Sequence, residues 1–470
     1  MDLFKLPKNK AEKFIRKHPI LAFKEPEHIR FSYDFCKKIG YANQDMLKYT
    51  NLLTLHHLIK VQHYWALEET GCHNIHPKLL SRAVYYFKRK IVCLKYQNFL
   101  KPEVDVVEKF LSYLNPPIKR PEKLQVSLEA IDDMTWKELH EEVLRDWLKV
   151  RLNASDDEIN KLYRIHKMFC NKSFRVIEEN IQLAESIGLT HNKILKCGYL
   201  LNNYPEYPKT VLRDFPNLAG LNIKSAMKSN PKLMMVDPKK MLKIYGLLKE
   251  YNIPDEHIQR KHQIFTMNVD SIKSRLMEIK QKKELQLVLE FNNILHVVIH
   301  QKKITSRLSY LQKLKMRCAS FKLFGHTDDA YFDNYIKEGK DINMKSDLIN
   351  FLAVLFQQDK KDISKKISVH PLCQYVPFID MQATYDFLIK TGFSKDNIYR
   401  VLPILLYPID KIKNAVKTIK TDPDTDYYIL NQYQILNLII YELEKVHHFT
   451  GNGIWTMENV TDEQQFIESE

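Results

Sequence analysis

Three stretches of the chain repeat one pattern, namely HPILAFKEP (18–26), NPKLMMVDP (230–238) and HPLCQYVP (370–377). In each stretch a polar residue precedes a proline, a short apolar run follows, and a second proline closes the run. A residue suited to the left-handed backbone conformation follows each first proline after 21 residues, at Gly40, Asn252 and Gly392. Glycine adopts this conformation without steric cost and asparagine at a small one, so such residues commonly end helices. The recurrence predicts one helical unit used several times.

A second motif surrounds these left-handed positions. It recurs in LAESIGLTHNKI (183–194), LLKEYNIPDEHI (247–258) and FLIKTGFSKDNI (387–398), with a further copy in CKKIGYANQDML (36–47) and a weaker one around Gly71. Each copy places an apolar residue directly after the Gly or Asn, which indicates a chain that turns back over the end of a helix. Thr190 and Ser394 then stand where a second helix needs an N-cap. The predicted unit is helix, turn, helix, turn and short third helix, in roughly 30–35 residues.

The repeats organise most of the chain. We expect an N-terminal segment at 1–13, a repeat array at 14–455 and an acidic tail at 456–470. The segment 115–121 holds three prolines and predicts a loop, so 115–123 is the candidate break in the array. The stretch 135–152 has apolar residues on one face of a helix.

Composition bears on the class of protein. Only 11 glycines occur among 470 residues, and neither G-x-G-x-x-G nor G-x-x-x-x-G-K-[ST] is present, which argues against a classical nucleotide-using enzyme. No Ser/His/Asp or Cys/His grouping has a supporting motif, so we expect no enzymatic activity. The net charge is +15, and 273–322 holds twelve Lys or Arg against three Glu. Such a field attracts polyanions, with nucleic acid the first candidate and an anionic membrane surface the second. No apolar run approaches the roughly 18 residues of a membrane span.

Cysteine and histidine usage favours neither disulfides nor a metal centre. The seven cysteines include no C-x-x-C pair, which is typical of buried thiols in a reducing compartment. Several potential ligands crowd one region, namely His56, His57, His63, Cys72, His73 and His76. No second ligand pair lies at a zinc-finger interval, so we expect no metal and no cofactor.

The proline, apolar-helix, glycine and isoleucine pattern resembles the repeats of the mitochondrial transcription termination factor (mTERF) family, over most of residues 14–420. The resemblance implies an all-α superhelical solenoid of three-helix units, curved into a half-ring, whose concave basic side holds a nucleic-acid duplex. It also implies a protein of the mitochondrial matrix that terminates or modulates transcription. The basic N-terminus MDLFKLPKNKAEKFIRK is compatible with the remnant of a targeting sequence.

The site prediction places nucleic-acid contacts on the helices that follow the repeat turns. The candidate phosphate- or base-contacting residues are Lys209, Arg213, Lys273, Arg275, Arg307, Lys411 and Lys413. Aromatic residues at the repeat corners are candidates for stacking on an everted base, namely Tyr204, Phe265 and Tyr407.

Three functions remain open at this stage. The first is a monomeric, duplex-DNA-binding regulator of mitochondrial transcription that works with other mitochondrial transcription proteins. The second is a factor that binds structured RNA and assists ribosome assembly on the same scaffold, and the sequence does not separate it from the first. The third is a helical scaffold that binds only proteins, for which the concentration of basic residues would have no purpose.

Overall fold

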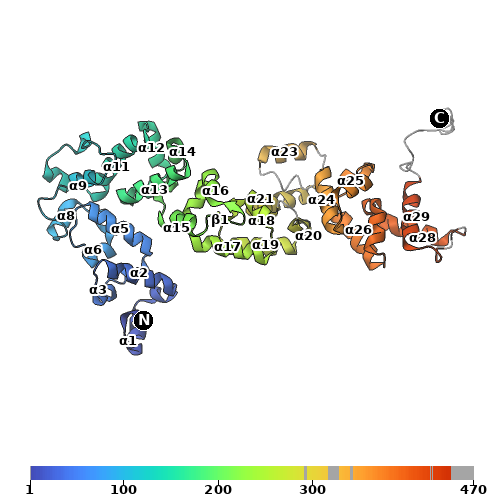
Figure 1. The fold of residues 1–470 in the computed structure, drawn as a ribbon, viewed down its shortest axis with the longest axis horizontal. Coiled ribbons are helices and arrows are strands. Elements are labelled where there is room, and N and C mark those ends of the chain that lie inside the picture. Colours follow the sequence, from blue (N-terminus) through green and yellow to red (C-terminus); the bar gives the residue numbers. More distant parts are fainter. Residues whose placement is uncertain are drawn as a thin grey trace. The chain divides into compact units, whose positions relative to one another are not determined.

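The computed structural model describes residues 2–290, 294–315, 328–338, 342–423, 425 and 427–445, and the chain divides into two compact units, Met1–Tyr245 and Gly246–Glu470. Each unit is built of helices (Figure 1), and in the described residues the only strands are the paired β1 (Asn217–Leu218) and β2 (Leu221–Asn222). The expectation of an all-α fold is therefore confirmed. The predicted tail 456–470 and the end of the array at 446–455 lie outside the described residues. The unit boundary falls inside one helix, and the proline-rich loop around 115–123 lies within the first unit.

The helices up to this boundary are, in chain order, η1 (Asp2–Phe4), α1 (Lys8–Lys17), η2 (Pro19–Phe23), α2 (Pro26–Lys38), α3 (Asn43–Lys48), α4 (Asn51–Thr54), α5 (His57–Glu69), α6 (Pro77–Ser81), α7 (Ala83–Tyr86), α8 (Ile91–Tyr96), α9 (Val106–Ser112), η3 (Glu122–Leu124), α10 (Leu128–Asp133), α11 (Trp136–Leu152), α12 (Asp156–Ile165), η4 (Lys167–Asn171), α13 (Phe174–Ile187), α14 (His191–Lys196), η5 (Gly198–Asn202), α15 (Glu206–Asp214), α16 (Ile223–Ser229), η6 (Pro231–Met235) and α17 (Pro238–Glu250), where η marks a 3-10 helix.

The helices described after the boundary are α18 (Asp255–Arg260), η7 (His262–Thr266), α19 (Val269–Gln281), α20 (Lys283–Gln286), η8 (Leu287–Glu290), α21 (Ile294–Lys313), α23 (Asp329–Glu338), α24 (Lys345–Phe356), α25 (Lys360–Ile367), η9 (Pro371–Gln374), α26 (Phe378–Lys390), α27 (Lys395–Arg400), η10 (Leu402–Leu406), α28 (Ile409–Thr421) and α29 (Gln432–Glu444).

The predicted three-helix unit recurs in this order. A long α-helix ends at a left-handed residue, a short α-helix follows, and a 3-10 helix leads into the next long helix, as in α13–α14–η5 and α26–α27–η10. The third helix of the predicted unit is thus the 3-10 helix. Its start coincides with the first proline of the motif at Pro19, Pro231 and Pro371. A proline at that position gives up a backbone N–H that would have no helical partner.

The left-handed turns form as the sequence predicts. Gly40, Asn252 and Gly392 have φ angles of 88°, 56° and 97°. In each case the next residue donates its N–H to the carbonyl five residues earlier, for example Phe393 to Leu388 at 3.1 Å. This hydrogen bond satisfies a carbonyl at the helix end that would otherwise lack a partner.

The N-caps predicted at the second helix are confirmed. The hydroxyl of Thr190 accepts from the N–H of Lys193 at 3.4 Å, and that of Ser394 accepts from Asn397 at 3.3 Å. The helix predicted at 135–152 is α11, which begins with a reciprocal capping box between Thr135 and Glu138.

Aromatic packing and one buried carboxylate join distant helices of the first unit. Trp136 on α11 stacks on Phe87 with ring centroids 4.0 Å apart, and its indole N–H donates to Thr70 at 2.7 Å. The fully buried carboxylate of Glu69 on α5 accepts from the N–H groups of Phe174 and Arg175 at 2.9 and 3.0 Å. Glu69 thereby caps α13 from more than 100 residues away, and burial raises its pKa to about 7.

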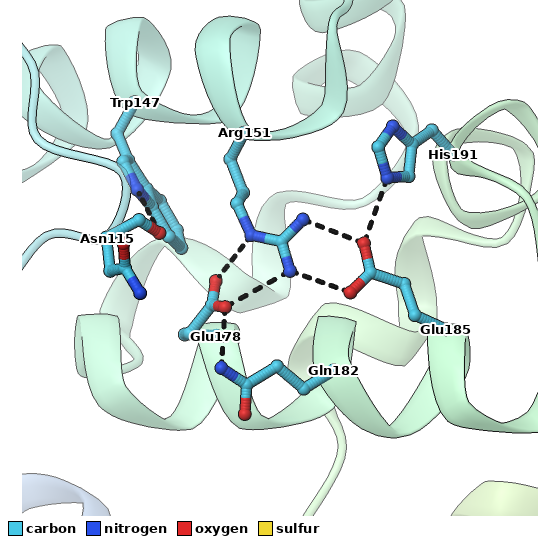
Figure 2. A network of polar contacts seen from close by, with 7 residues as sticks. All are labelled: Asn115, Trp147, Arg151, Glu178, Gln182, Glu185 and His191. Atoms are coloured by element: carbon cyan, nitrogen blue, oxygen red, sulfur yellow. Dashed lines mark hydrogen bonds and ion pairs between the residues drawn. The ribbon is translucent and has the colours of Figure 1, made fainter.

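A guanidinium clamp fastens α11 to α13 (Figure 2). Arg151 donates to both Glu178 and Glu185, and Glu185 also contacts the imidazole of His191 at 2.9 Å. The second unit has an apolar core of its own between 348 and 439, in which Leu352, Met381 and Leu436 are fully buried. Contacts of this kind fix the helices in place, and the exposed sides of these helices carry the charged side chains.

Candidate nucleic-acid interface

The outer face of α28 carries a row of lysines that form no ion pair within the described residues. Ile412, Ala415 and Ile419 are buried on the inner face of this helix. The opposite face exposes the side chains of Lys413, Lys417 and Lys420 at positions i, i+4 and i+7, here called the α28 lysine row. Residues with this spacing lie on one side of a helix.

Aromatic rings support two lysines of this row. The ammonium of Lys413 lies 5.3 Å from the ring centroid of Phe387, and that of Lys420 lies 4.7 Å from the ring of Tyr427. Within the part of the chain that the structure describes, no carboxylate forms an ion pair with any member of the row. The neighbouring Lys411 is also exposed and has no such pair among the same residues. A duplex phosphate can reach these ammonium groups without displacing an internal anion.

A polar groove lies between α19 and α21 in the same unit. Its volume is about 670 Å³, and hydroxyl side chains line both walls, with Ser271 and Ser274 on α19 and Thr305, Ser306 and Ser309 on α21. The exposed Lys302 lies at its edge. A shallower depression of about 460 Å³ continues along α19 past the exposed Lys273. Lysines and hydroxyls are among the groups that most often contact nucleic-acid backbones.

Two predicted contacts instead hold the protein together. Arg275 donates to the carbonyls of Val298 and Ile299 at 2.7 and 2.8 Å, which ties α19 to α21. Arg307 is 4% exposed and donates to Asp328 and Asp329 at 2.6 and 3.1 Å. We therefore withdraw Arg307 as a nucleic-acid contact because its side chain is buried. Arg275 is half-buried, and both of these hydrogen bonds come from its Nη1, so it stays a predicted contact.

The positive charges in this region contribute to the pKa shifts of one residue on α21 and one on α23. Hydrogen bonds from Lys303 and Arg307 hold the pKa of Asp329 below its usual value. Burial, followed by repulsion from Lys261 and Arg275, lowers the pKa of His300. Part of the basic density at 273–322 thus stabilises the fold.

The two predicted contacts on α15 are exposed but paired. Lys209 forms an ion pair with Glu179 at 2.8 Å, and Arg213 forms one with the adjacent Asp214 at 2.6 Å. Exposed pairs of this kind exchange partners at little cost, so both residues stay predicted contacts. Lys273, Lys411 and Lys413 have no such compensation among the described residues.

The stacking candidates are covered. Phe265 is fully buried, and Tyr407 is 5% exposed and donates to Glu444 at 2.8 Å. Burial and this hydrogen bond raise the pKa of Tyr407. Tyr204 is half-buried, with the ammonium of Lys172 lying 4.4 Å from its ring centroid. We withdraw Phe265 and Tyr407 as base-stacking residues because core neighbours occupy their ring faces, while Tyr204 stays a prediction.

The histidines and the cysteine that lie close together in the sequence between residues 56 and 76 do not form a metal site among the described residues. His56 and His57 stack with ring centroids 4.6 Å apart, whereas burial lowers the pKa of His63 to about 4. Within the described residues, no three potential metal ligands come together. No described helix is both long and apolar enough to span a bilayer.

Sequence reasoning missed Lys417, Lys420 and the hydroxyl walls. The i, i+4, i+7 spacing in KIKNAVKTIK (411–420) was a sufficient signal for the two lysines. The walls had no such signal, because they depend on the pairing of α19 with α21.

The fold and its exposed basic faces define a class, that of all-α helical-repeat proteins with the mTERF pattern. The chain is 25% identical over 461 residues to "Transcription termination factor 5, mitochondrial" of Drosophila melanogaster, which covers 96% of this chain and 82% of that protein. The chain is thus similar over nearly its whole length to a protein named as a mitochondrial transcription termination factor. No family model and no solved structure matches it.

Proposed function

We propose that the protein is a non-enzymatic regulator of mitochondrial gene expression that binds duplex DNA in the matrix and thereby terminates or modulates transcription. The observation that carries this proposal is the α28 lysine row, three exposed ammonium groups without an ion pair among the described residues. Like charges held close together on a folded helix repel one another, and a bound polyanion relieves this repulsion. The relative in Drosophila, named as a transcription termination factor, makes nucleic acid the expected polyanion.

The spacing of the row suits a phosphate backbone. Seven residues of α-helix rise about 10 Å, and the charges of one DNA strand follow one another every 3.4 Å or so along the duplex axis. Lys413, Lys417 and Lys420 can therefore neutralise about three phosphates of one groove edge. Lys411 and Lys273 add further contacts of the same kind. Contacts of this sort position the protein on the duplex without reading its sequence.

The proposed arrangement extends this local contact over the whole chain. We take the repeated units to stack into a solenoid that curves as a half-ring, with its basic concave side on the duplex. Small rotations between neighbouring repeats produce such extended curved surfaces in repeat proteins. A protein of this kind needs no cofactor and acts as a monomer.

Comparative titration tests the proposal. The full-length protein is mixed with duplex DNA from a mitochondrial promoter or terminator region, with random duplex DNA and with structured ribosomal RNA, at several salt concentrations. We expect binding to duplex DNA that weakens steeply with salt and is tighter for a mitochondrial site than for random sequence. Binding to ribosomal RNA alone would contradict this function and favour a role in ribosome assembly. Binding to none of them at moderate salt would leave a protein-binding scaffold.

A further inference from the structure

A hollow on the first unit is lined by three large apolar side chains that the fold leaves exposed. It lies between η2, α4, α6 and α7 and has a volume of about 270 Å³. Ile20, Val84 and Tyr85 line it and are 62%, 46% and 50% exposed. Their neighbours Leu21 and Ala83 are buried, so η2 and α7 pack on the core with their other sides. Apolar side chains that share one hollow, in contrast to single exposed ones, are typical of interaction sites.

The charged residues that line this hollow are both positive. Lys24 and Arg82 are part of its wall, and no Asp or Glu is among the described residues that line it. Arg89 adds a third cation, because its guanidinium lies 4.5 Å from the ring centroid of Tyr85 and donates to the hydroxyl of that ring. Arg82 and Arg89 are exposed, and none of the three cations forms an ion pair in the described part of the chain. The site therefore complements an acidic ligand.

The apolar walls favour a protein over a nucleic acid as this ligand. A nucleic-acid backbone consists of phosphates and sugars, which offer little apolar surface to cover Ile20 and Val84. A base could stack on Tyr85, but the guanidinium of Arg89 already lies against that ring. A protein segment can place apolar side chains beside carboxylates, and an amphipathic helix does so with apolar anchors at positions i, i+3, i+4 and i+7.

The size of the hollow indicates how such a segment would bind. About 270 Å³ is below the usual range of small-molecule sites and has room for one large apolar side chain. We propose that this hollow docks an acidic amphipathic helix of a partner protein, with one leucine or phenylalanine side chain in the hollow and carboxylates on Lys24 and Arg82. The site lies in the first unit and the α28 lysine row in the second, so this ligand is additional to the proposed duplex and does not depend on it.

Binding of defined peptides to the full-length protein tests the docking site. Three fluorescent peptides of about 16 residues, long enough to form a helix, are compared by anisotropy. The first has leucines at i, i+3, i+4 and i+7 and glutamates at most other positions, the second has the same composition with the leucines dispersed around the helix, and the third has lysines in place of the glutamates. We expect the first to bind about tenfold more tightly than the other two, because only it presents an apolar stripe beside carboxylates. Equal binding of the three peptides, or binding of none, overturns the proposal.

Variants with a matched control place the peptide in the hollow. A Lys24→Glu, Arg82→Glu variant should bind the first peptide about tenfold more weakly, and Val84→Asp should do the same by putting a charge on the apolar wall. The control Lys38→Glu, Lys161→Glu makes the same change in net charge at exposed lysines outside the hollow and should retain most of the affinity. Circular dichroism and the urea midpoint confirm that each variant is folded. Equal losses in the charge variant and its control would show attraction to the net charge alone and overturn the docking site.

Two further measurements address other occupants. If Lys24→Glu, Arg82→Glu weakens duplex-DNA binding more than the control does, nucleic acid occupies the hollow and the proposal falls. A dimer in sedimentation velocity that Val84→Asp dissociates would assign the hollow to a second copy of the chain instead. Duplex binding equal to that of the control, together with the loss of peptide binding, supports the proposal. If no variant and no wild type binds duplex DNA, the proposed function fails, while the peptide comparison still decides the docking site.

Discussion

Arg151 on α11 donates two parallel hydrogen bonds to the carboxylate of Glu185 on α13, at 2.7 and 2.8 Å. The same guanidinium donates to Glu178, two turns earlier on α13, at 2.9 and 3.1 Å. The three side chains are 13%, 32% and 17% exposed, respectively, for Arg151, Glu185 and Glu178. Only a planar guanidinium can serve two carboxylates in this way, so the contact fixes the register of the two helices.

Replacing Arg151 with methionine should destabilise the first unit by about 2–4 kcal/mol, because two partly buried carboxylates lose their counterion. Arg151→Lys should fall between this variant and the wild type. Urea unfolding measures the difference. In the control Lys123→Ala, which removes an exposed pair with Glu142, the loss should stay below about 1 kcal/mol. Equal losses in the two positions would mean that the clamp is not special.

The clamp also predicts a dependence on pH. Arg151 holds the pKa of Glu185 below its ordinary value of 4.5. A depressed carboxylate pKa contributes stability that is present above the unfolded pKa and is lost as the pH falls through the folded pKa. The difference in unfolding free energy between the wild type and Arg151→Met should therefore shrink below pH 4.5. A difference that is constant from pH 7 to pH 3 would contradict this assignment.

Two glycines with open space around them allow the effect of backbone strain to be measured apart from the effect of side-chain packing. A methyl group on either Gly392 or Gly246 would meet no atom within 4 Å. Gly392 has a φ of 97°, so Gly392→Ala should destabilise by about 1–2 kcal/mol. Gly246 lies in α17, so Gly246→Ala should stabilise by about 0.5–1 kcal/mol. Thermal unfolding midpoints that move in the same direction for both variants would refute the role of the left-handed turn.

The buried ammonium of Lys172 should oppose folding at neutral and acidic pH. Its side chain is buried against Gln62 and the ring of Tyr204, and burial lowers its pKa to about 7 from 10.5. A depressed lysine pKa gives stability that is fully present above the unfolded pKa of 10.5 and is lost as the pH falls from 10.5 to about 7. Lys172→Met should thus gain stability relative to the wild type by on the order of 2–4 kcal/mol more at pH 6 than at pH 10. Urea unfolding at the two pH values measures this difference, and an equal effect at both would place the ammonium in contact with water.

The parts of this structure that depend on local chemistry could be predicted from the sequence. Gly392 and Ser394 act within one turn of chain, so their roles as helix end and N-cap follow from residue type and spacing. Lys273 and Arg275 stand two positions apart on α19, yet one is exposed and the other bonds the carbonyl of Val298. That difference is set by α21, more than 20 residues away, and no local pattern contains it.

The same limit applies to the aromatic candidates. Tyr407 lies at a repeat corner, where the sequence predicts an accessible ring, but Glu444 on α29 accepts its hydroxyl and the core covers its faces. On α28 the sequence prediction covers Lys411 and Lys413 only, although Lys417 and Lys420 lie on the same face of the helix as Lys413. The face follows from the burial of Ile412 and Ile419.

The salt dependence of duplex-DNA binding tests the central claim most directly. On B-DNA the slope of log Kobs against log salt is about −0.9 per phosphate neutralised. The triple variant Lys413→Gln, Lys417→Gln, Lys420→Gln should make the slope shallower by about 2.7, since three contacts are lost. The control Lys90→Gln, Lys123→Gln, Lys445→Gln removes the same charge from residues already in ion pairs, and its slope should stay close to that of the wild type. An unchanged slope in the first variant, or equal changes in the two, would show that the α28 lysine row does not contact the duplex.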